Sequence, residues 1–330
     1  MEKLYLALAC GDYDRTRALI DGTIAPEGIQ LNYIALRSEE IFWRMVRYHE
    51  FDASEMSLSN YISLRNKNDP SFVAIPVFPS RLFRHSFVFI NVGSGIETPE
   101  DLKGKKMGVP AYSITAALWV RGFLKDDYGV SARDIYWFVG GQEEHGRKDR
   151  IDLRLPADIK VTPIPQDKTL SNMLENGEID ALLSARIPSC FEKGSGRVRR
   201  LFPNYGDVEV DYYRRTKIFP IMHVVVIRRE IHDRHPWVAR SLYKAFCQAK
   251  EICIQKMAIS NTLVCTLPWF FVEIDQLKKL FGADWWPYGI EANRHTLKKL
   301  IRYMVEQGVL ESEMEVDALF VPNTKDEFKI

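Results

Sequence analysis

Short apolar runs alternate with stretches of helical spacing along most of the chain, and this alternation restricts the fold more than any other feature. It is typical of an α/β protein with mostly parallel sheets. In the last third the pattern predicts mainly helices, one from Pro236 to about Met257 and another from about Asn293 through Glu306, ended by Gly308. Strands are predicted at residues 4–10, 29–35, 73–77, 87–91, 106–109, 135–139, 160–164, 180–184 and 221–227.

Two helix starts have recognisable capping residues. Ser38 precedes two glutamates and a run with apolar residues at helical spacing, so it is predicted to cap that helix. Thr98 precedes Pro99 and is followed three positions later by Asp101, which is the spacing of a capping box with proline at the first helical position.

Length and charge limit the size of the domains and the kind of partner. At about 150 residues per domain, 330 residues correspond to two domains. Lys plus Arg total 45 against 44 Asp plus Glu, a net charge of +1, which disfavours nucleic acid or an anionic membrane surface as a partner. No run reaches the roughly 18 to 20 apolar residues that span a bilayer. The first residues lack the apolar segment and cleavage site of a signal peptide, so we expect a cytoplasmic protein.

The spacing of the cysteines and the absence of common enzyme motifs argue against several kinds of site. The five cysteines are scattered and contain no Cys-x-x-Cys pair, which argues against a disulfide framework and a thiolate zinc site, and we expect buried reduced thiols. The sequence has no P-loop, no Gly-x-Gly-x-x-Gly and no Gly-x-Ser-x-Gly motif. The histidines do not form a His-x-x-x-His pair, although His85, His223 and His295 could still converge in space on a metal ion.

No Gly/Ser-rich linker separates two domains, so a single flexible tether between them is not expected. Residues 97–109, Glu-Thr-Pro-Glu-Asp-Leu-Lys-Gly-Lys-Lys-Met-Gly-Val, and residues 174–182, Leu-Glu-Asn-Gly-Glu-Ile-Asp-Ala-Leu, resemble two turns of type II periplasmic-binding-protein folds. The resemblance implies a two-lobed α/β fold with a central ligand cleft. Lobe one would consist of residues 1–95 and 222–330, and lobe two of residues 96–221. Ligands commonly bind between domains, at the carboxyl ends of strands.

The densest polar cluster lies in residues 79–86, Pro-Ser-Arg-Leu-Phe-Arg-His-Ser. The guanidinium groups of Arg81 and Arg84 are suited to bidentate binding of a carboxylate. Alternatively, one arginine is a surface charge and His85 is a core residue. If strand alternation holds from Phe83, His85 and Arg84 lie on opposite faces, so at least one of them turns away from a cleft.

Two helix starts and one strand end supply further candidate binding groups. Tyr112, Ser113 and Thr115 lie between a strand and a helix, where hydroxyls and free amides form an anion site, although Ser113 could be a plain cap. Ser59, with Ser57, offers the matching position in lobe one. Arg186 follows a predicted strand and could close onto a ligand from the second lobe.

His223 begins the strand that would return to lobe one, where its ring could line the hinge or could instead be a hydrogen-bonded core residue. Residues 285–295 combine aromatic side chains, among them Tyr288, with polar residues that end at His295. This composition is richer in polar groups than core packing requires.

Five stretches resemble the 4,5-dihydroxyphthalate decarboxylase family: residues 78–91, 110–112, 140–147, 219–223 and 287–293. The resemblance implies a cytoplasmic enzyme that converts a hydroxylated aromatic dicarboxylic acid, 4,5-dihydroxyphthalate, to 3,4-dihydroxybenzoate and carbon dioxide. A solute-binding protein for an aromatic or dicarboxylic acid would instead be exported, and the amino terminus disfavours that alternative. An enzyme that acts on another small acid remains a third interpretation.

The chemistry of aryl decarboxylation assigns roles to these residues. A hydroxyl para to the departing carboxylate raises electron density at the ring carbon, a general acid protonates that carbon, and loss of carbon dioxide restores aromaticity. We expect His223 to donate the proton, with Glu143 as an alternative donor, and His85 or His295 to contact the ring hydroxyls. Arg81, Arg84 and Arg186, assisted by the helix start at Ser113, would hold the carboxylate that stays.

The expected scheme requires no organic cofactor, and a divalent metal ion chelated by the ring hydroxyls stays an open alternative. The expected partner is a small aromatic carboxylate, and a cytoplasmic enzyme of this size is expected to be a homo-oligomer.

Overall fold

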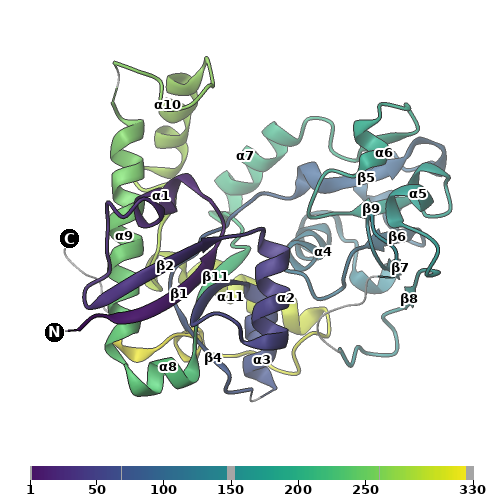
Figure 1. Ribbon diagram of the computed structural model, residues 1–330. Helices are drawn as coiled ribbons and strands as arrows, with labels where there is room; N and C mark the ends of the chain where they lie inside the picture. The colour runs from purple at the N-terminus through teal and green to yellow at the C-terminus, as the bar shows by residue number, and fades with distance from the viewer. Residues whose placement is uncertain (1, 68, 147–152, 260, 325–330) are drawn as a thin grey trace. The chain divides into compact units, whose positions relative to one another are not determined.

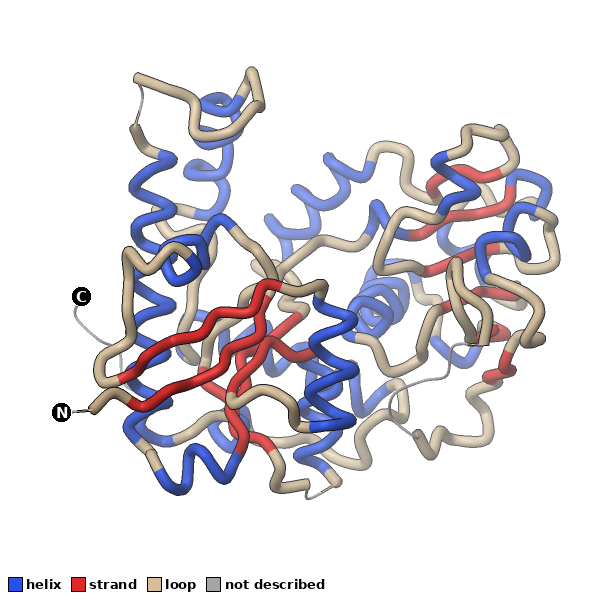
Figure 2. Tube along the Cα trace, viewed as in Figure 1, coloured by secondary structure: helices blue, strands red, loops and turns tan. Residues whose placement is uncertain are grey.

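The computed structural model describes residues 2–67, 69–146, 153–259 and 261–324, and the chain divides into two compact units. Unit 1 consists of Met1–Ser80, His223–His295 and Glu315–Ile330, and unit 2 of Arg81–Met222 and Thr296–Met314. Figures 1 and 2 show the elements of each unit. The predicted lobe one includes residues 81–95 and 296–314, whereas in the structure these residues pack with unit 2.

Unit 1 is built on a five-stranded sheet with the order β2-β1-β3-β11-β4. β1 runs parallel to both β2 and β3, whereas β11 is antiparallel to β3 and β4. The sheet is therefore mixed rather than mostly parallel as predicted. Its strands are β1 (Leu4–Cys10), β2 (Ile29–Ala35), β3 (Ala53–Ser57), β4 (Phe72–Ile75) and β11 (His223–Arg228).

Helices flank this sheet, and α9 packs against α1 and β4. The helices of unit 1 are α1 (Arg17–Ile20), α2 (Ser38–Tyr48), α3 (Leu58–Asn66), α8 (Arg229–Arg234), α9 (Trp237–Met257) and α10 (Phe270–Phe281). α9 follows Pro236 and ends at Met257, as predicted. The predicted cap at Ser38 is wrong, because Arg37 occupies the cap position and Ser38 is the first helical residue.

Unit 2 contains a six-stranded sheet with the order β10-β5-β9-β6-β7-β8. β5 is antiparallel to β9 and β10, and the remaining pairs are parallel, so this sheet is also mixed. Its strands are β5 (Val88–Asn91), β6 (Lys106–Val109), β7 (Tyr136–Val139), β8 (Val161–Pro163), β9 (Ala181–Leu183) and β10 (Val198–Arg200). β10 was not predicted, and β5 starts one residue later than predicted because His85–Phe87 form a 3₁₀ turn.

The helices of unit 2 are α4 (Thr115–Tyr128), α5 (Leu170–Glu175), α6 (Ser189–Glu192) and α7 (Tyr205–Thr216), together with most of α11 (Arg294–Glu306). The predicted capping box is confirmed at Pro99–Leu102, where the Asp101 carboxylate accepts hydrogen bonds from the backbone N–H and the hydroxyl of Thr98. The helix predicted to end before Gly308 ends at Glu306.

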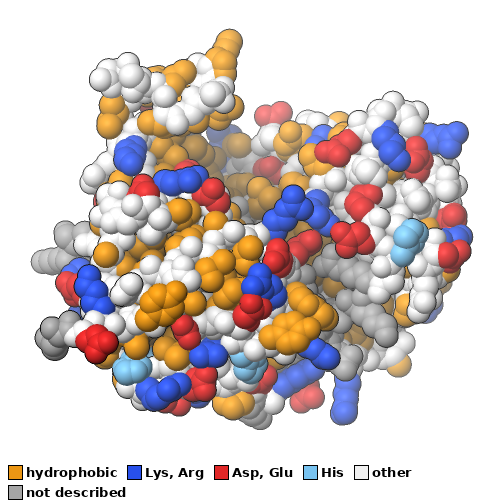
Figure 3. Space-filling view, in the orientation of Figure 1, with side chains coloured by type: hydrophobic (Ala, Val, Ile, Leu, Met, Phe, Trp, Pro, Cys, Tyr) orange, Lys and Arg blue, Asp and Glu red, His pale blue; other side chains and the backbone are white. Residues whose placement is uncertain are grey.

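Charged side chains of both signs are interspersed over the face drawn in Figure 3. Among the described residues, no helix is both long enough and apolar enough to span a bilayer. The five cysteines, all of them described, form no disulfide. Cys10 and Cys190 are buried as predicted, whereas Cys247 and Cys253 are only partly buried and Cys265 is exposed, contrary to the prediction.

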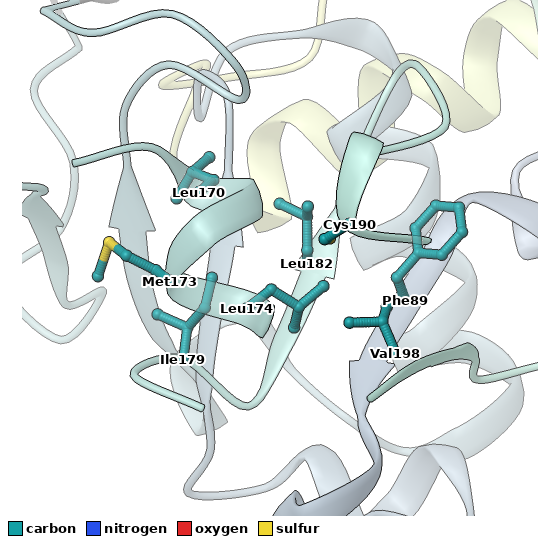
Figure 4. Close-up of a cluster of buried hydrophobic side chains, with 8 residues drawn as sticks. All are labelled: Phe89, Leu170, Met173, Leu174, Ile179, Leu182, Cys190 and Val198. Atoms are coloured by element: carbon teal, nitrogen blue, oxygen red, sulfur yellow. The ribbon is translucent and has the colours of Figure 1, made fainter. Parts of the chain in front are cut away.

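A cluster of apolar side chains packs α5 onto the unit 2 sheet (Figure 4). Burying each large side chain of this kind contributes about 1.5–3 kcal/mol to folding. Gly108 in β6 permits the close approach, because a Cβ there would lie 2.7 Å from Ile179 and 2.9 Å from Leu170. The cluster consists of Phe89, Leu170, Met173, Leu174, Ile179, Leu182, Cys190 and Val198.

Candidate functional site

A buried carboxylate organises the site in unit 1. Glu55, in the middle of β3, is fully buried and accepts hydrogen bonds from the backbone N–H of Gly11 at 2.9 Å and the hydroxyl of Tyr13 at 2.7 Å. Its Oε1 also contacts Nδ1 of His223. A buried charge is costly unless it is paired and hydrogen-bonded, and these three contacts meet that requirement.

The register of the sheet explains why Glu55 and His223 meet. β11 runs antiparallel to β3, with His223 opposite Ser57 and Val225 opposite Glu55. Side chains of paired residues lie on the same face, so His223 and Glu55 are diagonal neighbours within reach of long side chains. The sequence predicted His223 but not Glu55, whose signal is a single acidic residue within an otherwise buried strand.

Burial raises the pKa of Glu55, but the charge of His223 and the hydrogen bonds from His223, Tyr13 and Gly11 outweigh it, and the pKa lies below its usual value. The pKa values of two neighbouring groups change in the opposite direction. Burial and the Glu55 charge raise the pKa of both the Cys10 thiol and the Tyr13 hydroxyl. Glu55 is therefore the ionised acceptor of the cluster, and Cys10 and Tyr13 are protonated donors.

The His223 ring is fixed on one side and accessible on another. Phe42 of α2 contacts it edge-on with ring centroids 4.9 Å apart, and 18% of the side chain is exposed. Because Glu55 occupies Nδ1, Nε2 is the nitrogen left to exchange a proton with a bound molecule. A carboxylate that orients an imidazole in this way is the arrangement found in many general acid–base sites.

The segment after β1 supports this pair. A Cβ at Gly11 would lie 2.6 Å from the Tyr13 ring, so glycine is needed for Tyr13 to reach Glu55. Arg15 stacks between Tyr13 and Trp286, 4.2 Å and 4.1 Å from the two ring centroids, and donates to the carbonyl of Pro79. These contacts of Arg15 hold the segment after β1 in place.

The start of α3 lies beside the pair. Ser57 and Ser59 are buried, and their hydroxyl oxygens are 3.3 Å apart. Because Ser57 is opposite His223 in the sheet, the hydroxyls and amides at this helix start are placed near the ring. Tyr288 is buried below Lys250, which lies 5.4 Å above its ring, and His295 is exposed in the first turn of α11.

In unit 2, Arg84 is a buried guanidinium whose described contacts include no carboxylate at ion-pair distance. Its Nε donates to Sδ of Met222 at 3.3 Å and its Nη1 to the carbonyl of Ala185 at 3.1 Å. Burial lowers the pKa of Arg84 to about 10, partly offset by the charge of Glu209. Met222 directly precedes His223 in the chain. Arg81 is also buried and donates to the carbonyl of Phe219 at 3.2 Å.

His85 is a core residue rather than a substrate contact. Its ring is 1% exposed and stacks on Phe123 with centroids 3.9 Å apart, and Phe202 and Tyr212 contact it at their edges. Burial, with a smaller contribution from the charge of Arg215, lowers its pKa to about 3. The structure supports the alternative that His85 is a packing residue, and it corrects the expectation that His85 contacts ring hydroxyls.

Glu143 acts as a structural acceptor. Its carboxylate accepts hydrogen bonds from the hydroxyl of Ser171 at 2.5 Å and from the hydroxyl and backbone N–H of Ser189 at 2.6 Å and 3.0 Å. Burial raises the pKa of Glu143, but these hydrogen bonds outweigh it and lower the pKa, so the group is a poor proton donor. Arg186 is exposed, and its carbonyl accepts from Gln142.

The loop before α4 is anchored by Arg121. This buried side chain donates to the carbonyl of Tyr112 at 2.7 Å, lies 3.8 Å from the centroid of the Tyr112 ring and donates to Gln307 at 2.6 Å. Tyr112 is therefore a core residue that fixes the loop. Ser113 and Thr115 are buried near the helix start, but Ile114 occupies the cap position, so Ser113 is not the cap.

Within the part of the chain that the structure describes, no group of three or more His, Cys, Asp or Glu side chains is placed to hold a metal ion. The metal site that His85, His223 and His295 could have formed is therefore not present among these residues.

Comparison with solved structures shows the fold. The chain is similar to a periplasmic sulfonate-binding protein from Methylobacillus flagellatus KT, with a TM-score of 0.53, 15% identity and coverage of 98% of this chain and 93% of the other. At this identity the likeness concerns the fold alone. It confirms the predicted periplasmic-binding-protein-like architecture.

Comparison with curated sequences shows the family, although no protein-family model matches the chain. The chain is 38% identical to 4,5-dihydroxyphthalate decarboxylase of Comamonas testosteroni over 330 residues, which cover 100% of both proteins. It is 44% identical to the Pseudomonas putida protein of the same name over 214 residues, 65% of this chain and 83% of the relative. The chain belongs to the 4,5-dihydroxyphthalate decarboxylase family.

Proposed function

We propose that this chain converts 4,5-dihydroxyphthalate to 3,4-dihydroxybenzoate and carbon dioxide without oxidation. The observation that carries the proposal is the contact between buried Glu55 and Nδ1 of His223, which leaves Nε2 as a proton donor at an accessible ring. Decarboxylation of an aromatic acid requires such a donor, because a free ring carbanion is too unstable to form. The names of the two curated relatives support the same reaction.

The proposed reaction consumes one proton. Protonated His223 transfers it from Nε2 to the ring carbon that carries the departing carboxylate. The oxygen para to that carbon becomes carbonyl-like while its own proton is held by an acceptor in the site. The bond to the carboxylate then breaks, carbon dioxide leaves, the ring becomes aromatic and the hydroxyl regains its proton. Solvent restores the proton on His223.

We assign Arg84 to the carboxylate that stays on the ring. A buried guanidinium with no carboxylate partner among the described residues is favourable for binding an anion by charge-assisted hydrogen bonds. Ser59, Ser113 and Thr115, at the starts of α3 and α4, remain proposed donors to substrate oxygens. The departing carboxylate should be bound by weaker interactions than the carboxylate that stays, because strong ion pairing there would stabilise the reactant and oppose the loss of carbon dioxide.

Replacing Arg84 by glutamine is expected to raise KM for the dicarboxylate by roughly 10- to 150-fold, because a hydrogen bond to a charged group contributes about 1.5–3 kcal/mol. The KM of Arg84→Lys should lie between those of wild type and Arg84→Gln, because lysine keeps the positive charge but lacks the planar guanidinium group. Steady-state kinetics measure both. Arg199→Gln, at a partly exposed residue paired with Glu97, is the control and should leave KM unchanged. An unchanged KM in Arg84→Gln, with thermal unfolding like wild type, would contradict the assignment.

We further propose that the enzyme works in the cytoplasm and without an organic cofactor. The five unpaired cysteines support a reducing compartment. The proton transfer above uses only side chains of this chain. A divalent ion chelated by the two ring hydroxyls is the alternative, and the assay below separates it.

The test is to incubate the purified protein with 4,5-dihydroxyphthalate, with and without a chelator, and to follow carbon dioxide and 3,4-dihydroxybenzoate. We expect both products in both arms. Loss of activity only with chelator would establish a metal requirement. Absence of product in both arms, together with thermal stabilisation by the compound, would replace the enzyme by a binding protein for aromatic dicarboxylates.

A further inference from the structure

A helical hairpin in unit 1 exposes an unusual amount of apolar surface. It consists of the end of α9, the connecting loop and α10, and Figures 1 and 2 show it extending beyond the sheet of unit 1. Of the sixteen large hydrophobic residues exposed in the described part of the protein, seven lie between Ile259 and Val272. They are Ile259, Leu263, Val264, Leu267, Trp269, Phe271 and Val272.

The area of this surface is that of an interface rather than of scattered exposed residues. Trp269 is 69% exposed, Leu267 57% and Val272 50%. For side chains of this size, the seven exposed fractions amount to roughly 600 Å², most of the ~800 Å² that each partner contributes to a standard interface. A monomer rarely exposes a larger apolar patch. Orange hydrophobic side chains are visible over the hairpin in Figure 3.

α10 has one face against its own unit and another that none of the described residues covers. Phe270 and Ile274 are its buried residues. The opposite face carries Phe271, Val272, Asp275, Lys278 and Lys279, which are all exposed and lie at helical spacing. Along this face the order is apolar, then acidic, then basic.

The charges on this face of α10 are complementary to those of a second copy when the two helices pack antiparallel. If two copies of α10 pack antiparallel about a two-fold axis, Asp275 of each copy lies beside Lys278 and Lys279 of the other. Phe271 and Val272 then lie beside the last turn of the other helix. A two-fold interface repeats every contact twice, so a single charge pattern is matched on both sides. Parallel packing would instead place like charges opposite each other.

We propose that the α9–α10 hairpin is the interface through which this protein associates with a second copy of itself, with the two α10 helices antiparallel. The apolar loop residues Leu267 and Trp269 extend the contact beyond the helix. The interface does not depend on the reaction proposed above, so the assembly can be tested separately from the activity.

The first test measures mass in solution by analytical ultracentrifugation of the full-length protein. We expect wild type to sediment as a dimer or a multiple of it, and Trp269→Glu/Val272→Glu to weaken association at least about tenfold, since a desolvated aromatic residue near the centre of an interface contributes strongly to binding. Val92→Glu, at a 49% exposed residue of unit 2, is the matched control and should keep the wild-type mass. Circular dichroism checks that each variant is folded. A monomeric wild type, or a hairpin variant with the wild-type mass, would overturn the proposal.

The second test examines the antiparallel orientation with two charge variants. Asp275→Lys makes the exposed face of α10 wholly basic, and Lys278→Glu/Lys279→Glu makes it wholly acidic. Each variant alone should associate more weakly than wild type, and an equimolar mixture of the basic and the acidic variant should recover the dimer. Parallel helices would place like charges opposite each other already in wild type, so neither variant alone would associate more weakly for this reason, and that result would contradict the orientation.

Discussion

Replacing His223 by asparagine is expected to lower kcat roughly 1000-fold, within the range of about 10²–10⁴ that general acid catalysis contributes. Asparagine keeps a polar group near Glu55 but cannot deliver a proton to carbon. KM should change little, because the ring donates a proton and does not hold the carboxylates. The measurement is the rate of 3,4-dihydroxybenzoate formation at saturating substrate.

Two other histidines provide the comparison for this result. His145→Asn, at an exposed position, should retain the wild-type kcat. His295→Asn tests the remaining alternative for a histidine that contacts the ring hydroxyls, and a change in KM larger than in kcat would support that role. Turnover of His223→Asn within threefold of wild type would exclude His223 as the donor.

Glu55→Gln is expected to lower kcat about 100-fold. The amide keeps the size of the side chain but removes the charge that faces His223, and a catalytic imidazole whose carboxylate partner is neutralised loses its orientation and its preferred proton position. The measurement is kcat at saturating substrate, with the unfolding temperature of the variant recorded beside it.

A companion variant separates positioning from general damage to the fold. Tyr13→Phe removes one hydrogen bond to Glu55 and leaves the charge of Glu55, so it should lower kcat by less than Glu55→Gln does. Glu230→Gln, at an exposed carboxylate, is the matched control for loss of charge. If Glu55→Gln and Tyr13→Phe lose activity only in proportion to a lower unfolding temperature, Glu55 supports the fold rather than the proton transfer.

The elements predicted correctly from the sequence are those whose local signals are strong. The strands at residues 4–10, 29–35 and 106–109 are found with the predicted bounds, because apolar or alternating runs end there at glycine, proline or polar residues. The parallel character of the sheets was less predictable. Pairing direction depends on how distant segments meet, and β11 arrives between β3 and β4 from more than 140 residues away.

The candidate residues near position 85 show where local pattern fails. Alternation from Phe83 requires an extended chain, whereas His85–Phe87 form a 3₁₀ turn that directs His85 into a cluster of aromatic rings. The partners in that cluster come from α4, α7 and the loop at Phe202, which are remote in sequence. A single sequence does not reveal such a group of neighbours, so a structural histidine resembled a catalytic one.

Glu55 is a site residue that the sequence pattern did not reveal. An acidic residue between alanine, serine and methionine gives a weak strand pattern, and the nearby hydroxyls of Ser57 and Ser59 give a stronger signal for a binding site. Only the antiparallel pairing with β11 shows that His223 is the partner of Glu55. A lone carboxylate in a strand that is buried on both faces is a useful signal, since such a charge requires a specific partner.

The division of the chain between the two units has a consequence for synthesis. The unit 2 sheet contains only residues from 88 to 200, whereas in unit 1 β11 fills the gap between β3 and β4 and ends at Arg228. A growing chain therefore exposes β1, β2 and β3 with an open edge while the whole sheet of unit 2 is already available to pair. Although domains generally fold from the amino terminus during translation, we expect the order to be reversed here. The amino-terminal sheet closes late, and its apolar strands are the part of the nascent chain that most needs protection from aggregation.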